Sequence, residues 1–92
     1  MKTAFALALG ALWLGACATA PQSLPDPDSP GAKTYRSRCS GCHALPHPGR
    51  HTAASWRHLL ALMERRMQER SLPPLTDQER RAILDYLAAH AR

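Results

Sequence analysis

Cys39, Cys42 and His43 are the residues of this chain whose types and spacing specify chemistry most directly. The two thiols are separated by two residues, and the imidazole follows the second thiol immediately. This Cys-x-x-Cys-His order is the attachment signature of a c-type haem, because each thiol can form a thioether bond with one vinyl group of the porphyrin. The histidine then binds the iron from one face as the proximal ligand. The sequence therefore predicts one covalently bound haem c.

Helices are expected to position these residues. Ser29 is a candidate N-cap, and Pro30 suits the first helical position, so a first helix is expected over about residues 31–39. It would end at the first thiol. Residues 44–54 are expected to form a loop, because prolines and a glycine interrupt them and they lack helical periodicity.

Two further helices are expected after this loop. Ser55 is the candidate cap of a helix from Trp56 to about Arg70, whose apolar residues recur with helical spacing. Residues 76–79 form a capping box that opens a third helix ending at about His90. The apolar face of that helix is expected to consist of Ile83, Leu84 and Leu87, with Tyr86 on its flank.

The fold class expected from these elements is all-α, because the chain lacks strand signals. Residues 31–92 would form one small domain with three main helices around the haem. A domain of roughly 60 residues buries only a marginal core, and such domains often require a cofactor or another cross-link. A covalent porphyrin would supply apolar bulk, so the size of the domain and the haem motif agree.

The first residues have the pattern of an export signal. Lys2 supplies the positive charge, and residues 4–14 form an apolar stretch that is too short for a transmembrane helix. The stretch ends in Leu-Gly-Ala-Cys, which resembles the lipobox of bacterial lipoproteins. Residues 1–16 are therefore expected to be a lipoprotein signal peptide, and Cys17 the lipidated first residue of the mature chain.

An ordinary secretory peptide, cleaved near Ala18 or Ala20, is the alternative to lipidation. The odd number of cysteines favours the lipoprotein, because lipidation gives a role to the one cysteine outside the haem motif. Residues 17–30 would then be the lipidated cysteine and a proline-rich tether, because this composition favours an extended spacer. Ala18 after the cysteine is similar to lipoproteins sorted to the outer membrane of Gram-negative bacteria.

The net charge of +5 makes the chain basic. A basic surface favours acidic protein partners or anionic lipid headgroups, although a solvated face is the simpler interpretation. Nucleic acid is a poor candidate partner for an exported chain in which aromatic residues do not alternate with the basic ones. No small-molecule substrate is evident from the sequence.

The order Gly31-x3-Tyr35-x3-Cys39-x2-Cys42-His43 resembles the N-terminal helix of the class I family of small monohaem cytochromes c. In that family the first and last helices cross closely at the glycine, with aromatic residues beside the crossing. The resemblance implies that Tyr35, Tyr86 and Leu87 pack there. It also implies that Pro46, or alternatively Pro48, helps to position the carbonyl that accepts the imidazole hydrogen bond. The residues expected to pack around the haem are Tyr35, Pro46, Trp56 and Leu60.

The distal iron ligand is expected to be Met63. Many class I members carry this methionine in the loop before the last helix, but residues 71–75 contain none. The spacing Trp56-x6-Met63 resembles a subset of small cytochromes whose methionine faces the haem. A thioether is a soft ligand that raises the reduction potential. Met67 and His51 are the alternatives, and His47, His58 and His90 are weaker ones.

These observations predict a membrane-anchored electron carrier, and not an enzyme, that faces the periplasm and exchanges electrons with redox partner proteins. A haem-based ligand-binding or sensing module with an open distal site is one alternative. A zinc-binding structural lipoprotein, using Cys39, Cys42, His47 and His51, is a weaker one, because the ligand pairs are closer together than in zinc fingers. A thioredoxin-like dithiol is weaker still, since the βαβ pattern is lacking.

Overall fold

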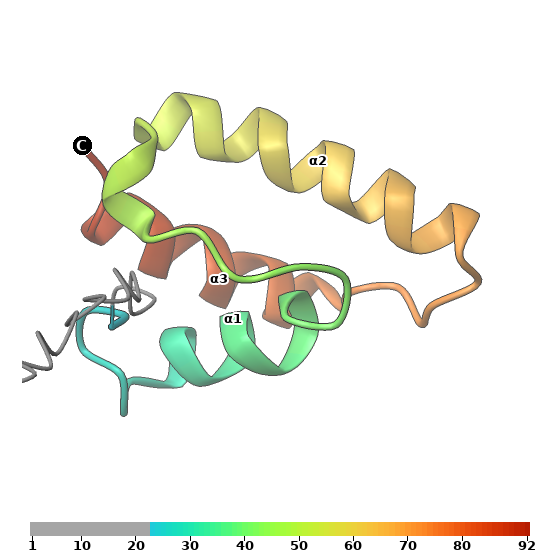
Figure 1. Ribbon diagram of the computed structural model, residues 1–92, viewed down its shortest axis with the longest axis horizontal. Helices are drawn as coiled ribbons and strands as arrows, with labels where there is room; N and C mark the ends of the chain where they lie inside the picture. The colour runs from blue at the N-terminus through green and yellow to red at the C-terminus, as the bar shows by residue number, and fades with distance from the viewer. Residues whose placement is uncertain (1–22) are drawn as a thin grey trace, which may run out of the picture.

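The computed structural model describes residues 23–92, and the regular structure in this range is entirely helical. The order along the chain is α1 (Pro30–Cys39), a short 3₁₀ helix η1 (Pro48–Arg50), α2 (Ala53–Glu69) and α3 (Asp77–Ala89) (Figure 1). The expected all-α class is confirmed. Within residues 23–92, no helix is both long enough and apolar enough to span a membrane.

Helix α1 begins and ends as its sequence predicts. The Ser29 hydroxyl accepts a hydrogen bond from the Ala32 amide at 3.2 Å, and Pro30 occupies the first turn. This cap satisfies one of the amides that the first turn leaves without a helical partner. Cys39 is the last helical residue, so α1 carries the first thiol at its C-terminal end.

Helix α2 begins one turn earlier than expected. The N-cap is Thr52, whose hydroxyl accepts from the Ser55 amide at 3.1 Å, and Ser55 is the third helical residue. The prediction of Ser55 as the cap was therefore wrong. Two alanines, at positions 53 and 54, separate the two candidate caps, and alanine has the highest helix propensity. The helix therefore extends back to the earlier cap.

The end of α2 is a Schellman motif built on a serine. Ser71 has a φ of 55°, in the left-handed region usually taken by glycine. Its amide donates to the Gln68 carbonyl at 3.1 Å, and the Leu72 amide donates to the Met67 carbonyl at 2.9 Å. This geometry turns the chain back and places Leu72 beside Met67.

Helix α3 opens with the expected capping box. The Glu79 amide donates to the Thr76 hydroxyl, and the Thr76 amide donates to the Glu79 carboxylate at 3.0 Å. The backbone hydrogen bond from Thr76 lowers the pKa of Glu79, and the Arg38 guanidinium lowers it further. The helix ends at Ala89, one residue before the expected end.

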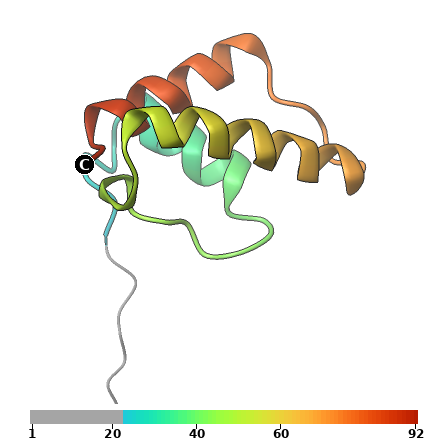
Figure 2. The same ribbon diagram turned by 90° about the horizontal axis from the view of Figure 1, so that it is seen from above.

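Helix α3 packs against both α1 and α2 and lies between them (Figure 1; seen from above in Figure 2). Its Ile83 and Leu87 are buried as expected, and Leu84 is partly buried. Tyr86 is buried as well, and does not lie on an exposed flank. The remaining buried hydrophobic residues of the core are Ala32, Tyr35, Trp56, Leu60 and Leu75.

Part of the expected tether is folded onto the domain. Leu24 packs against the core, and the Tyr86 hydroxyl donates to the Pro25 carbonyl at 2.7 Å. A turn closed by the Ser29 amide and the Asp26 carbonyl then leads into α1. This segment and the C-terminus lie together at one end of the three-helix arrangement (Figures 1 and 2). The predicted signal peptide and Cys17 lie outside the described residues.

Candidate functional site

A cavity of about 420 Å³ lies at the end of α1 that carries the thiols. Its volume falls within the range of roughly 300–1,000 Å³ that is usual for ligand pockets. One wall is formed by the end of α1 and the turn that follows it, and the other by α2 from Leu59 onward together with Arg70 and Leu72. The cavity therefore lies between the Cys39–His43 motif and α2.

The attachment wall contains both thiols and the imidazole of the motif. Cys39 is partly buried, whereas Cys42 and His43 are exposed. Burial raises the pKa of the Cys39 thiol to about 11, so its sulfur is neutral at neutral pH. Both cysteines are free thiols and both line the cavity. They are thus available for two thioether bonds.

His43 is oriented by a backbone carbonyl. Its Nδ1 lies 2.8 Å from the Ala44 oxygen. Because a carbonyl can only accept, Nδ1 carries the proton in this contact, and Nε2 is left with the lone pair that binds a metal. The carbonyls of Pro46 and Pro48 accept hydrogen bonds from Tyr35 and Trp56. The expected role of either proline in positioning the carbonyl bound by the imidazole stays a prediction.

The opposite wall carries two thioethers among mostly apolar side chains. Met63 and Met67 line the cavity from α2, one helical turn apart, and both are partly buried. The apolar side chains of Leu59, Leu62 and Leu72 extend this wall. Leu62 and Leu72 are the exposed large hydrophobic residues of the described chain, each 42 % exposed. The thiols, the imidazole, the thioethers and the apolar side chains of the two walls are the groups that would hold a haem.

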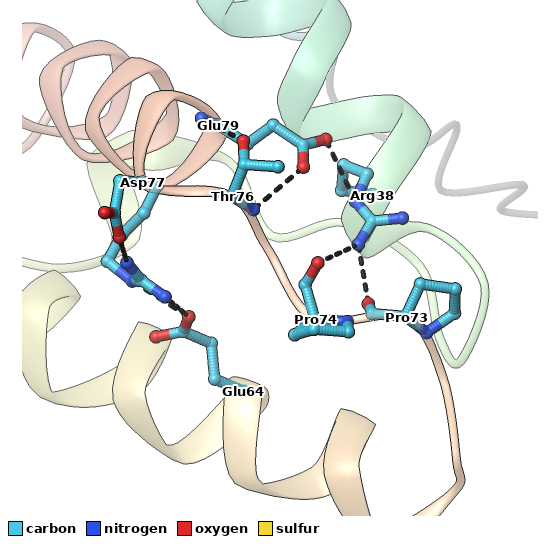
Figure 3. Close-up of polar contacts among 8 residues, drawn as sticks. Arg38, Glu64, Pro73, Pro74, Thr76, Asp77 and Glu79 are labelled. Atoms are coloured by element: carbon cyan, nitrogen blue, oxygen red, sulfur yellow. Dashed lines mark hydrogen bonds and ion pairs between the residues drawn. The ribbon is translucent and has the colours of Figure 1, made fainter.

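Arg38 connects the loop after α2 to the C-terminal end of α1, where Cys39 lies. Its guanidinium Nη2 donates to the carbonyls of Pro73 and Pro74 at 2.6 and 3.1 Å, and its Nε lies 3.1 Å from the Glu79 carboxylate (Figure 3). The loop contains Leu72, which lines the cavity. The residue just before Cys39 therefore connects the attachment wall, the loop and the start of α3.

A second polar contact fixes α2 on α3. Arg80 donates from Nε to the Glu64 carboxylate at 2.9 Å and from Nη1 to Asp77 at 2.8 Å (Figure 3). Glu64 is next to Met63 in sequence but does not line the cavity. This contact therefore constrains the rotation of α2 and the direction in which its methionine face points.

The two aromatic residues that were expected to pack around the haem, Tyr35 and Trp56, lie in the hydrophobic core. Trp56 is 1 % exposed, and its Nε1 donates to the Pro48 carbonyl at 2.7 Å. The Tyr35 hydroxyl donates to the Pro46 carbonyl at 2.9 Å, and burial raises the pKa of Tyr35. Neither these residues nor Leu60 line the cavity. Direct packing of these side chains on the porphyrin stays a prediction.

The other histidines lie outside the cavity lining. His51 packs edge-on against Trp56, with ring centroids 4.8 Å apart, and its carbonyl accepts from the Arg92 amide. His47 caps η1 by accepting from the Gly49 amide, and His90 packs against Tyr86. His58 is exposed on α2. Met63 and Met67 line the cavity and His51 does not.

The four side chains of the zinc interpretation are not brought together. Cys39 and Cys42 lie at the cavity, whereas His47 and His51 are held at η1 and Trp56. Within residues 23–92, no three histidine, cysteine or acidic side chains form a group that could bind a metal ion.

Arg66 and Arg70 also line the cavity, and sequence reasoning did not single them out. Their spacing of four residues, in register with Met63 and Met67, was the available signal. A second, more open cavity of about 700 Å³ lies on the other side of the loop and shares Met67 and Leu72 with the first.

The family model described as dihaem cytochrome c matches residues 35–92, which is more than half of the chain. The chain belongs to the dihaem cytochrome c family. The match includes the whole Cys39–His43 motif, α2 and α3, and so supports a c-type cytochrome that binds haem and transfers electrons. No curated protein and no solved structure matches the chain.

This family assignment corrects the resemblance to monohaem class I cytochromes, because the matching family is dihaem. The 92 residues nevertheless contain a single Cys-x-x-Cys-His motif, and the one further cysteine is Cys17, outside the matched range. A second haem attached in the same way would require another such motif.

Proposed function

We propose that this cytochrome is a lipid-anchored carrier with one haem c that passes single electrons between redox partners in the cell envelope. The observation that carries the proposal is the cavity whose two walls hold the Cys39–His43 motif and the methionines of α2. The haem supplies the one-electron chemistry. The protein contributes attachment, axial ligation and a surrounding that sets the potential.

His43 is the proximal ligand in this proposal, and Met63 is the distal one. The Ala44 carbonyl fixes the His43 tautomer and leaves Nε2 for the iron. Met67 also lines the second cavity beyond the loop, whereas Met63 lines only the cavity beside the motif. The more central position on this wall favours Met63.

An absorption spectrum of the protein matured with haem tests the proposal. We expect a covalent, reducible c-type spectrum with one haem per chain, and a methionine–iron band in the red region of the oxidised spectrum. Met63→Leu should abolish this band and lower the reduction potential, because a thioether ligand favours the reduced iron. Met67→Leu, one turn along the same wall, is the matched control and should keep the band.

Three other outcomes would contradict the proposal at different points. Colourless protein would remove the cytochrome function altogether. Loss of the band in Met67→Leu alone would move the distal ligand to Met67. Rapid binding of carbon monoxide by the reduced wild-type protein would favour the ligand-binding or sensing alternative, in which the distal position is open.

The proposed location depends on Cys17 as a lipid anchor facing the periplasm, in the outer membrane of a Gram-negative host. Attachment through several acyl chains would be stable, whereas a single chain gives only marginal binding. Cys17→Ser should therefore release the cytochrome into the soluble fraction or block its maturation. Membrane fractionation with haem staining measures this, and unchanged membrane association of the variant would rule out the anchor.

A further inference from the structure

Arginine is the only residue type on the cavity lining that carries a permanent charge. Three arginines line the cavity, and none of the lining residues is acidic. A haem has the opposite charge pattern, because its two propionate side chains are carboxylates. We propose that Arg66 and Arg70 form a carboxylate-binding pair that holds the haem propionates. This proposal rests on the haem function proposed above and adds a site for the anionic edge of the cofactor.

The third arginine, Arg38, is already engaged. Its guanidinium binds the Pro73 and Pro74 carbonyls and pairs with Glu79, and its side chain is only 23 % exposed (Figure 3). Withdrawing it to bind a propionate would release the loop that carries Leu72. Arg38 therefore has a structural role, and Arg66 and Arg70 are left as the carboxylate ligands.

Arg66 and Arg70 lie on one face of α2 because they are four residues apart. Arg66 pairs with Glu69 at 3.0 Å, but the two side chains are 64 % and 58 % exposed. An exposed pair of this kind contributes little to stability, so a propionate can replace Glu69 at little cost. Within residues 23–92, the Arg70 guanidinium has no hydrogen-bonding or ion-pair partner.

A favourable interaction with the helix dipole could by itself place basic residues near the end of α2. This effect acts equally on every basic residue of the last turns, including Arg65, which lies outside the haem cavity. Only Arg66 and Arg70 combine the helix end with the cavity face. Their planar guanidinium groups can also bind carboxylates through two parallel hydrogen bonds, which a lysine cannot do.

The reduction potential of the haem distinguishes propionate binding by these arginines from a simple interaction with the helix dipole. A positive charge near the iron disfavours the oxidised state and raises the potential. An arginine bound to a propionate also keeps that carboxylate ionised over the working pH range. We therefore expect a wild-type potential that is nearly independent of pH between about pH 5 and pH 8, where an unpaired propionate would titrate.

The variants to compare are Arg66→Gln, Arg70→Gln and their combination, with Arg65→Gln as the control. All remove one charge per substitution from exposed positions in the last turns of α2 or at its C-cap, Arg70. The double variant should show a lower potential than the control and a potential that falls as the pH rises, because its propionates then ionise within this range. Arg70→Lys should have a reduction potential closer to that of the wild type than Arg70→Gln has, because lysine keeps the positive charge.

The remaining ionisable groups of the lining do not produce the same pH profile. The two cysteine sulfurs are consumed by thioether bonds, and the His43 ring is bound to the iron. Arg38 stays charged throughout. Glu69 pairs with Arg66 and keeps this partner in Arg70→Gln. A change in the pH profile that also appears in Arg70→Gln therefore reports on the propionates.

A potential in the double variant that is no lower than in Arg65→Gln, together with an unchanged pH profile, would overturn the propionate site. That result would leave the haem function intact, because the spectrum would still show covalent haem. Absence of haem from the wild-type protein would instead overturn the proposed function itself.

Discussion

A chain in which Cys39 and Cys42 are both replaced by serine should carry no haem and should lose most of its stability. The buried core consists of eight hydrophobic residues, two of them tyrosines. A single core in a domain this small rarely supplies more than about 3–5 kcal/mol. The apolar wall around Met63 packs against this core but is only partly buried, and a bound porphyrin would complete its burial. We expect a loss of about 3 kcal/mol or more, equivalent to a fall of roughly 12–24 °C in Tm.

Haem staining after denaturing electrophoresis and thermal unfolding followed by circular dichroism measure the two parts of this prediction. Ser40→Ala is the matched control, because Ser40 also lies between the two cysteines but is exposed and does not line the cavity. The control should retain haem and a Tm close to wild type. A double serine variant as stable as this control would show that the haem does not support the fold.

Local signals in the sequence predicted the parts of the fold that depend on neighbouring residues. The Ser29 cap before Pro30 and the capping box at Thr76 both operate within four residues. Their side-chain hydrogen bonds are therefore nearly independent of the rest of the chain. The haem motif is local in the same sense, since its chemistry depends on the spacing of three residues.

The start of α2 and the environment of Trp56 required information that is not local. Thr52 and Ser55 are both good N-caps. The helix propensity of Ala53 and Ala54 favours the earlier cap, and η1, which the sequence did not predict, holds the chain in place there. The Pro48 carbonyl in η1 accepts the Trp56 indole hydrogen bond. This contact fixes where the chain enters the helix, and it also places Trp56 in the core behind the cavity.

The arginines of the cavity wall show a different limit of sequence reasoning. On a helical stripe, Arg66 and Arg70 look like ordinary solvated residues, and only the position of the α1 end reveals that they face the haem motif. The contacts that Leu24 and Pro25 make with the folded domain could not be predicted from neighbouring residues either. A proline-rich composition favours an extended spacer, and the partner that overrides this preference, Tyr86, is 61 residues away.

The contact between α1 and α3 is the other feature on which the fold depends, and Gly31 lies within it. A Cβ at this position would lie 2.5 Å from the Tyr86 Cβ and 3.0 Å from the Ala82 carbonyl oxygen. Both atoms belong to the rigid part of α3, so a rotamer change cannot relieve the clash and the two helices must separate. The close crossing that the glycine predicted is therefore confirmed.

Gly31→Ala should destabilise the cytochrome, although alanine is the better helix former by about 1 kcal/mol. Overpacking of a close contact costs about 1–3 kcal/mol. The displacement of Tyr86 also weakens its hydrogen bond to Pro25. We expect a net loss of about 1–2 kcal/mol, seen as a fall of roughly 4–16 °C in the Tm of the haem-loaded protein.

The absorption spectrum should not change in Gly31→Ala, and this separates the helix crossing from the haem site. Gly31 and Cys39 are eight residues apart on α1, a distance of about 12 Å along the helix. The clash acts on the end of α1 that contacts Tyr86, while the Cys39 end is held by Arg38 and the Pro73–Pro74 carbonyls. A lower Tm with an unchanged methionine–iron band would support a structural role for Gly31. A Tm equal to that of wild type would mean that α1 and α3 can separate without loss, and an altered band would mean that the crossing also sets the geometry of the iron.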